Sequence, residues 1–538
     1  MDAEPATVHI SQLPPEVWLL CWSQCSRRLL RRLSVVCRLF RSLVLPLLWE
    51  AQTFDASKDF SPMTSHTQIR HLHRTAVRLD RMADSGAPYA SWVRSLTITS
   101  RRSYHWQNSL PPHLHTLEES LELFRSMHSR ILLAFSTALP LCSNLATLHL
   151  THMHVDDSLL KSLGSLSRLE ALHLNLCNFG ILQNAIVLPI EHLELTECTR
   201  SSDNGVLRIA SPHTLRTLNP DYFIAQLLRG FGSEDLEQLV TLSLPAIFDI
   251  ALVIALLKRC SALESLTIQT ITLELDFPPL PLLVLPRLRA LDAPHYMHPW
   301  LVPGRPITSA TVGIGQLGHW DDDTLVRTCL AISYSAAPIL SLAVCRPTVP
   351  RLETLVKIFS LFPELQELLF SVDNPTHIRV ERRCCLRSAS RRVPPSLVQP
   401  PPDLRDDFAF DEVPVEEISD GEEGRNEIIV VRADEADALA EEMKPPSNNF
   451  QNTLNWLMDG KLTLPPNIQV LQLQIFGPYA ELPWMFDSRH IARLVARYPR
   501  LRKLGLGSRF HHWEKNSDEC GTLWKSTDRR KGWVRVVS

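Results

Sequence analysis

The feature that most constrains the fold of this chain is a six-residue pattern of apolar residues that returns along most of its length. The pattern is apolar-x-x-apolar-x-apolar, and the last two apolar residues of each copy have the two-residue period of a strand with one buried face. Central leucines at positions 148, 172, 193, 218, 242, 266 and 291 are 24, 21, 25, 24, 24 and 25 residues apart. The copies are Val93-Leu96-Ile98, Leu145-Leu148-Leu150, Leu169-Leu172-Leu174, Ile190-Leu193-Leu195, the weaker Leu215-Leu218, Leu239-Leu242-Leu244, Leu263-Leu266-Ile268, Leu288-Leu291-Ala293, Ile339-Leu342-Val344, Leu365-Leu368-Phe370, Ile468-Leu471-Leu473 and Leu501-Leu504-Leu506.

A period of this length with an LxxLxL core resembles the leucine-rich-repeat family, and Cys177 and Cys198 stand where that family has Asn or Cys. One strand with one helix cannot bury its apolar face alone, so stacked units are expected to form a solenoid with a curved parallel sheet. The fold class is therefore α/β. Helices are expected between strands, at residues 157–166, 251–260, 352–362 and 491–498, with Asp156 and Asp157 suited to cap the first.

Two intervals in the series are about twice the usual length. Leu96 and Leu148 are 52 residues apart, and Leu291 and Leu342 are 51 residues apart. Each interval is long enough to contain one irregular repeat.

Side chains that alternate with the buried leucines are expected to point away from the core, onto the concave face of the sheet. In the clearest copies these positions hold polar and imidazole groups, which suit protein recognition. A merely solvated sheet face is the alternative. The predicted substrate-binding residues are Thr147, His149, His173, Asn175, His192, Glu194, Thr267 and Gln269.

A second constrained stretch is residues 13–50, which reads as a bundle of short helices. It opens with LPPE, where proline is tolerated in a first helical turn and the acid suits the helix dipole. A second apolar set recurs from Leu29 to Phe40 at helical spacing, and Pro46 is expected to break that pattern. About forty residues bury little of their own apolar surface, so the aromatic residues need cover from the rest of the chain or from a partner. These are Trp18, Trp22, Phe40 and Trp49.

The order LPxEV, a leucine–arginine helix, VVCRLFRSL and LPLLW resembles the F-box motif. It departs from that motif at residues 23–27, where Ser-Gln-Cys-Ser-Arg replaces an Asp- or Pro-led turn. The resemblance implies docking on the SKP-type adaptor of a cullin–RING ubiquitin ligase. By motif match, the implied adaptor contacts are Leu13, Pro14, Glu16, Val17, Leu33, Val36, Cys37, Phe40, Leu48 and Trp49. A helical cap on the larger domain is the alternative.

Arginines at 27, 28, 31, 32, 38 and 41 make this stretch basic, and the functional interpretation is electrostatic steering to an acidic adaptor. Nucleic-acid contact is not expected, because the flanking repeats are not basic.

Composition changes after the repeat at Leu368. Residues 376–450 begin basic, become proline-rich, and from Asp403 to Glu442 contain 16 acids against 3 arginines, which is typical of disorder. The expected organisation is an F-box-like unit at 10–52, a connector at 53–90, repeats at 91–375, the insertion at 376–450, terminal repeats at 451–507 and a C-terminal cap at 508–538.

The composition also limits the classes of function. A net charge of −3 argues against a general nucleic-acid binder, and no run of eighteen apolar residues predicts a membrane span. Twelve scattered cysteines without a secretory signal indicate reduced thiols in the cytoplasm or nucleus. Neither the GxGxxG form at residues 313–318 nor the histidines at 149, 152 and 154 has the context of a nucleotide or metal site. No cofactor, metal ion or catalytic residue is expected.

The sequence as a whole therefore resembles an F-box protein with leucine-rich repeats, of a fungal type. That resemblance implies the substrate receptor of a Skp–cullin–F-box ubiquitin ligase, with repeats that bind an unidentified protein substrate. A repeat scaffold without any ligase role and an enzyme whose site the sequence does not reveal are the alternatives.

Overall fold

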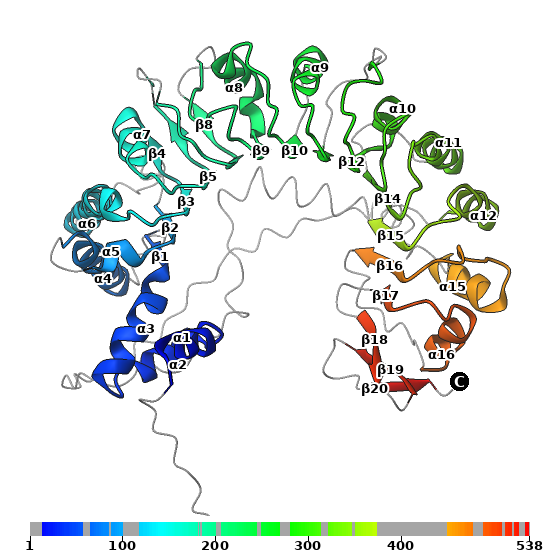
Figure 1. The fold of residues 1–538 in the computed structure, drawn as a ribbon, viewed down its shortest axis with the longest axis horizontal. Coiled ribbons are helices and arrows are strands. Elements are labelled where there is room, and N and C mark those ends of the chain that lie inside the picture. The colour runs from blue at the N-terminus through cyan, green and yellow to red at the C-terminus, as the bar shows by residue number, and fades with distance from the viewer. Residues whose placement is uncertain are drawn as a thin grey trace, which may run out of the picture. The chain divides into compact units, whose positions relative to one another are not determined.

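The fold is described from a computed structural model of the chain (Figure 1). The residues described are 13–56, 65–84, 88–100, 118–180, 182, 186–200, 206–244, 249–269, 280–313, 321–346, 350–373, 449–476, 488–507, 512–518, 521–526 and 533–536. They belong to two compact units, one of Met1–His319 with Arg327–Ser341 and one of Trp320–Val326 with Leu342–Ser538. Both combine helices with parallel strands, as the predicted α/β class requires. The insertion predicted to be disordered, residues 376–450, lies outside the described residues except for its last two residues, 449–450, which begin a helix.

Three helices open the described chain: α1 (Pro15–Ser23), α2 (Arg27–Leu33) and α3 (Arg38–Glu50). Residues 13–50 are called the N-terminal helical unit below. Its core is an aromatic cluster in which the rings of Trp22 and Phe40 meet edge-on at 4.7 Å, with Trp18 at 5.2 Å from Trp22. Leu30 and Val44 complete the buried cluster. The expectation that Trp22 and Phe40 need cover from elsewhere is therefore wrong, because the unit buries both rings itself.

The predicted helix break at Pro46 is also wrong, since α3 continues through this residue. The break comes earlier, at Cys37, whose backbone is extended and whose Sγ accepts the Phe40 N–H at 3.4 Å. Two consecutive valines before it are β-branched and favour helix less than leucine or arginine does. Pro46 removes one backbone hydrogen bond, and packing of Leu47 and Leu48 on the aromatic cluster offsets that loss.

The first unit contains a parallel sheet whose strands pair in chain order. The strands are β1 (Ala51–Asp55), β2 (Ser95–Thr99), β3 (Thr147–Thr151), β5 (Ala171–Asn175), β7 (His192–Thr196), β9 (Thr217–Asn219), β10 (Thr241–Leu244), β11 (Ser265–Ile268), β12 (Ala290–Pro294) and β13 (Ser309–Gly313). Each is parallel to the next. The register places the central leucines, among them Leu96, Leu148 and Leu172, opposite one another in a buried row. Apart from β1 and β13, the apolar pattern predicts each of these strands.

Strand β1 escapes the pattern because Gln52 occupies the place of the central leucine. Its amide is satisfied in the core: Nε2 donates to the carbonyl of Leu48 at 2.7 Å, and Oε1 accepts from Arg78 at 2.7 Å. The sheet therefore begins at Ala51, and the boundary predicted at residues 52–53 falls inside a strand.

The two long intervals have different explanations. The interval from Leu291 to Leu342 contains β13, the irregular repeat that its length allowed. In the interval from Leu96 to Leu148, β2 pairs directly with β3, so no repeat of the sheet is inserted between them. This interval contains the long helix α6 (Glu118–Ala138) instead.

The segments between the strands are mostly helical, and these helices lie on one face of the first unit's sheet (Figure 1). Asp156 caps one of them as expected, because its Oδ1 accepts the Leu159 N–H at 2.8 Å. The helices and 3-10 turns are α4 (Ser65–Ala83), α5 (Tyr89–Trp92), α6, η5 (Leu139–Leu141), α7 (Asp157–Gly164), η6 (Asp221–Phe223), α8 (Ile224–Phe231), α9 (Ile250–Lys258), η7 (His295–Met297), α10 (His298–Leu301) and α11 (Asp322–Ser333). A small second sheet comprises β4 (His154–Val155), β6 (Asn178–Phe179) and β8 (Thr199–Arg200).

The second unit repeats the alternation of helix and strand. Leu368 lies opposite Leu471 in the parallel register of β15 and β16, although 103 residues separate them, so the insertion leaves the pairing intact. After β17 the strands turn antiparallel, and β18 to β20 follow the last parallel strand. The elements are β14 (Ser341–Arg346), α12 (Leu352–Leu361), β15 (Glu367–Asp373), α15 (Asn449–Asp459), β16 (Val470–Phe476), α16 (Ser488–Arg497), β17 (Lys503–Gly507), β18 (His512–Asp518), β19 (Gly521–Ser526) and β20 (Trp533–Val536).

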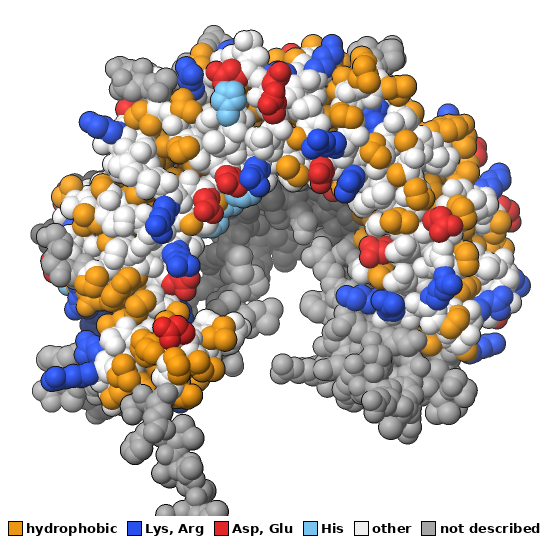
Figure 2. Space-filling model, viewed as in Figure 1, with side chains coloured by type: hydrophobic (Ala, Val, Ile, Leu, Met, Phe, Trp, Pro, Cys, Tyr) orange, Lys and Arg blue, Asp and Glu red, His pale blue; other side chains and the backbone are white. Residues whose placement is uncertain are grey.

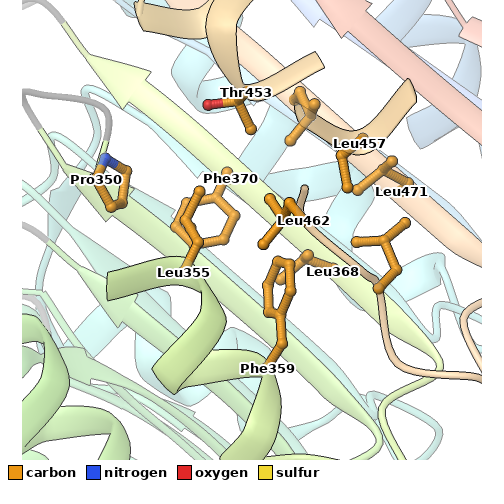
Figure 3. A pocket seen from close by; sticks show the side chains of 11 residues that line it. Pro350, Leu355, Phe359, Leu368, Phe370, Thr453, Leu457, Leu462 and Leu471 are labelled. Atoms are coloured by element: carbon orange, nitrogen blue, oxygen red, sulfur yellow. The ribbon is translucent and has the colours of Figure 1, made fainter. Parts of the chain in front are cut away.

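An apolar cavity of about 10 Å³ lies in the second unit between α12 and α15 (Figure 3). Leu355, Phe359 and Leu457 point into it, and its lining contains no charged side chain. This space holds about one water molecule, and an apolar lining offers that water no partner. It is a packing gap and not a ligand pocket.

A buried arginine joins the segment between β12 and β13 to the residues that precede β12. The Arg305 side chain is 1% exposed, and its guanidinium donates only to backbone carbonyls. Its acceptors are Val284 at 3.0 Å, Leu301 at 3.0 Å, Pro303 at 3.4 Å, Leu280 at 3.5 Å and Pro281 at 3.2 Å. Three of these carbonyls lie before β12 and two lie between β12 and β13, so one buried side chain joins the two segments and satisfies backbone acceptors in both.

Replacing this arginine should destabilise the first unit. Arg305→Met keeps the length of the side chain but leaves the buried carbonyls without a donor, which costs about 3 kcal/mol of unfolding free energy. Urea denaturation followed by tryptophan fluorescence measures the change. Arg287→Met, at an exposed neighbouring arginine, is the control and should change stability by less than about 0.5 kcal/mol. Equal midpoints for the two variants would contradict the role of Arg305.

Candidate functional site

Outward side chains of the parallel sheet form rows that run across its strands. The first row contains Thr147 and His192, and the second contains His149, His173 and Glu194, each opposite the next on β3, β5 and β7. Thr267 belongs to the second row further along, and Asn175 to the third. Gln269 follows the end of β11 and is exposed. The predicted substrate-binding residues therefore share one sheet face, and whether they bind a substrate stays a prediction.

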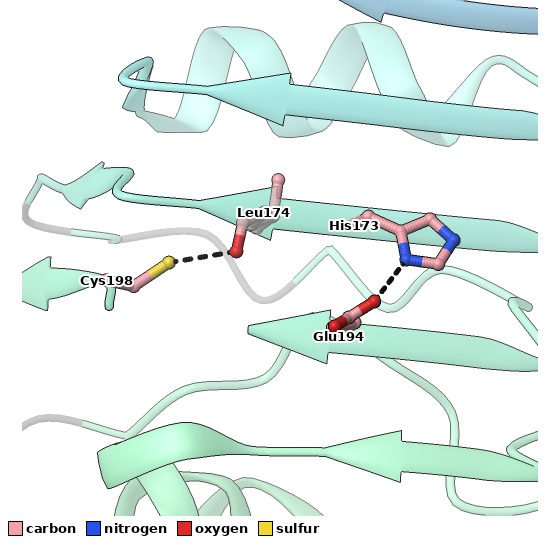
Figure 4. A network of polar contacts seen from close by, with 4 residues as sticks. All are labelled: His173, Leu174, Glu194 and Cys198. Carbon is pink, nitrogen blue, oxygen red and sulfur yellow. Dashed lines mark hydrogen bonds and ion pairs between the residues drawn. The ribbon is translucent and has the colours of Figure 1, made fainter. Parts of the chain in front are cut away.

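The centre of this face is a stacked pair of histidines with a glutamate. The rings of His149 and His173 lie 4.1 Å apart and nearly parallel, at 12°. His173 Nδ1 donates to Glu194 Oε2 at 2.7 Å (Figure 4). Burial and, to a lesser extent, the neighbouring His173 lower the pKa of His149, while Glu194 opposes that shift. The chain of contacts fixes the orientation of the Glu194 carboxylate on the open face.

Two buried cysteines support the turns that follow these strands. The thiol of Cys198 donates to the carbonyl of Leu174 at 3.2 Å (Figure 4), and that of Cys177 donates to Leu150 at 3.4 Å. Both occupy the position expected from the repeat. Both cysteines are buried packing residues, and neither thiol faces the open side of the sheet.

Asp292 on β12 belongs to the same second row and is absent from the predicted set. It lies opposite Thr267 on β11 and Thr311 on β13. Its side chain is half-buried, and burial raises the pKa of its carboxyl group. The copy Leu288-Leu291-Ala293 placed this residue between two buried positions, so the alternation that predicted Thr267 could also have found it.

Two histidines follow Asp292 at the end of the strand: His295, which is half-buried, and His298. His298 is fully buried, and its Nε2 lies 3.1 Å from the carbonyl oxygen of Ala293, which fixes the proton on that nitrogen. Burial lowers the pKa of His298 to about 4 and that of His295 to about 4. Both are therefore neutral at pH 7.

The N-terminal helical unit places its predicted adaptor contacts in three environments. Phe40 is a core residue, 7% exposed, and its role as an adaptor contact stays a prediction. Leu33, Leu48 and Trp49 are half-buried, and the Trp49 ring stacks on Tyr89 at 4.7 Å. The exposed members are Leu13, Pro14, Glu16, Val17, Val36 and Cys37.

The same unit exposes more apolar surface than the prediction named. Val35 is 83% exposed, Leu20 72% and Val36 63%, although the unit has a well-packed core. Apolar side chains gather over these helices at the lower left of Figure 2. We call the exposed set the helical-unit apolar patch: Leu13, Val17, Leu20, Leu29, Val35, Val36 and Leu39. Large apolar side chains that remain exposed on one small unit are typical of an interaction site.

Metal sites and membrane-spanning helices were also sought among the described residues. Among them, no group of three or more His, Cys, Asp and Glu side chains is arranged to hold a metal ion. Of the helices that the structure describes, none has both the length and the apolar character to span a membrane. Comparison of the sequence with models of protein families finds no matching family, and comparison with curated proteins finds no matching protein.

Acid should destabilise the chain through His298. A folded pKa near 4, below the ordinary value of 6.5, means that the stability linked to this group is complete above pH 6.5 and is lost as pH falls toward 4. The loss is roughly 2 kcal/mol at pH 5. His298→Gln keeps an N–H donor for Ala293 but does not titrate, so its thermal midpoint should fall less between pH 7.5 and pH 5.

The control for this measurement is His154→Gln, at an exposed histidine. It should keep the pH dependence of the unsubstituted chain. If His298→Gln loses as much stability on acidification as the control does, His298 is not the titrating group.

Proposed function

We propose that this chain is the substrate-recognition subunit of a Skp–cullin–F-box ubiquitin ligase. Its N-terminal helical unit would be an F-box that binds an SKP-type adaptor and, through it, the cullin and RING subunits. Its parallel sheet would be a leucine-rich-repeat solenoid that binds a protein substrate. The chain would need no catalytic residue and no cofactor, because its contribution is to hold a substrate near a ubiquitin-loaded enzyme. The cytoplasm or nucleus is the proposed location.

The observation that carries this proposal is the helical-unit apolar patch on an otherwise self-packed unit. A simple cap on the sheet would turn its apolar side chains toward the strands, whereas Leu20, Val35 and Val36 remain exposed. Four exposed arginines, Arg31, Arg32, Arg38 and Arg41, accompany the patch. An apolar surface with a basic margin suits an acidic adaptor, because the charges speed association and the apolar core supplies affinity.

A second support is the firm connection between the helical unit and the sheet. Helix α3 ends at Glu50 and β1 begins at the next residue, without a linker. The Arg27 guanidinium donates to the carbonyls of Leu48 and Ala51 across this junction. The Glu50 carboxylate lies 3.9 Å from the Arg94 guanidinium. An adaptor bound to the helices would therefore hold the sheet face at a fixed distance, which a receptor of this type requires.

Introducing negative charge into the patch should weaken adaptor binding. In a Val17→Asp/Val36→Asp variant both new carboxylates stand on exposed positions, so the fold should remain while affinity for a recombinant SKP-type adaptor falls about tenfold or more. Isothermal titration calorimetry on the full chain measures this. Leu133→Asp, at a leucine of α6 that is 71% exposed, is the matched control and should bind normally.

Replacing Leu13 and Pro14 together by alanine is a milder change at the same surface. It should reduce affinity without unfolding the sheet. If the unsubstituted chain fails to bind an adaptor that binds another F-box protein, the ligase proposal is wrong. A repeat scaffold without a ligase role would then be the better interpretation.

A further inference from the structure

The parallel sheet of the first unit has an unusual distribution of charge. None of the ten strands that the structure describes in it contains a lysine or an arginine. Their outward positions hold mainly serine and threonine, together with three histidines and the carboxylates of Asp55, Glu194 and Asp292. Small hydroxyl side chains leave room for another polypeptide to approach the sheet closely, and the only formal charges on these strands at neutral pH are negative.

Two of these carboxylates stand in the same row across the strands. Glu194 on β7 and Asp292 on β12 are separated by β9, β10 and β11, so the distance between them along the sheet is roughly 19 Å. Asn219, Ser243 and Thr267 lie between them on these strands. An extended segment of about seven residues spans this distance.

Each of the two carboxylates is prepared to accept a cation. His173 orients the Glu194 carboxylate by donating to its Oε2. The other carboxylate oxygen, Oε1, is left to accept from another donor. Asp292 is half-buried without an ion pair among the described residues, and burial raises the pKa of its carboxyl group. A cation placed beside it would recover interaction energy that the carboxylate loses on leaving water.

The residues at the edge of the sheet do not change the preference of this face for a cationic partner. Three arginines each stand immediately before a strand, and two of these three form ion pairs with glutamates. Arg94 lies 3.9 Å from Glu50, and Arg216 lies 3.2 Å from Glu191. An anionic partner, such as a phosphorylated peptide or a nucleic acid, would therefore meet carboxylates with few free cations.

We propose that the outward face of β7–β12 binds an extended, basic polypeptide segment of a protein partner, with Glu194 and Asp292 as its two anionic anchors. A lysine or arginine at each end of a seven-residue stretch would reach the two carboxylates, and the backbone between would meet the polar row. In calling this partner a substrate, the inference rests on the proposed ligase function. The binding itself is independent of the adaptor and is tested without it.

Fluorescence anisotropy with the full chain tests this surface. The probe is a fluorescein-labelled seven-residue peptide with arginine at both ends and serine between, and the comparison peptides carry glutamine or glutamate at the ends. The arginine peptide should bind most tightly, and its affinity should fall with added salt. Glu194→Gln and Asp292→Asn should each raise its Kd roughly two- to fivefold, and the double variant should multiply the two effects.

Glu353→Gln, at an acid in the first turn of α12 in the second unit, is the matched control and should leave the Kd unchanged. The acidic stretch from Asp403 to Glu442 offers the peptide another negative region, and binding there would survive in the double variant. That outcome, or equal affinity for the arginine and glutamine peptides, would overturn the proposal. Normal adaptor binding by the double variant would show that peptide binding by the sheet and adaptor binding by the helical unit are independent, so the two proposals can be tested separately.

Discussion

Packing of the inward leucines between neighbouring parallel strands is the interaction on which the rest of the first unit depends. Leu148 lies opposite Leu96 on one side and Leu172 on the other, and all three are fully buried. This row fixes the register of each strand, because a shift by one residue would expose every leucine. A fixed register also aligns the outward residues. The contact between His173 and Glu194 exists because the leucines beside them cannot slip.

The same constraint explains how the helical unit is attached. Strand β1 joins the leucine row with Gln52 in place of leucine, and its amide exchanges hydrogen bonds with Leu48 and Arg78. The end of α3 is thus bonded to a side chain in the sheet core. Arg78 also lies 4.9 Å over the Phe54 ring, which lies in the same strand. Gln52 therefore joins the end of α3 and Arg78 of α4 to the first strand of the sheet through side-chain hydrogen bonds.

Sequence reasoning succeeded where the period was regular and failed where one residue changed the local physics. The leucine pattern predicted β2, β3, β5, β7 and β9 to β12 of the large sheet, but not the short strands of the second sheet, and alternation placed His149 and Glu194 on the open face. The pattern could not find β1, because a buried glutamine in a leucine position becomes acceptable only through partners distant in sequence. Proline at position 46 was expected to break a helix, but tertiary packing held α3 together. Exposure of Val35 and Val36 likewise depends on how three helices pack, which the apolar pattern does not reveal.

The two candidate surfaces differ in chemistry, although the net charge of the chain is only −3. The helical-unit apolar patch is accompanied by arginines, whereas the strands of the sheet have carboxylates and no cation. Under the two proposals above, a partner that fits one surface would be repelled or left unsatisfied by the other, so each would be directed to its own site. This separation is a property of the residues themselves, since the leucine rows determine only which positions face outward. Substituting Glu194 or Asp292 would therefore alter the charge that the sheet face presents without changing the leucine core beneath it.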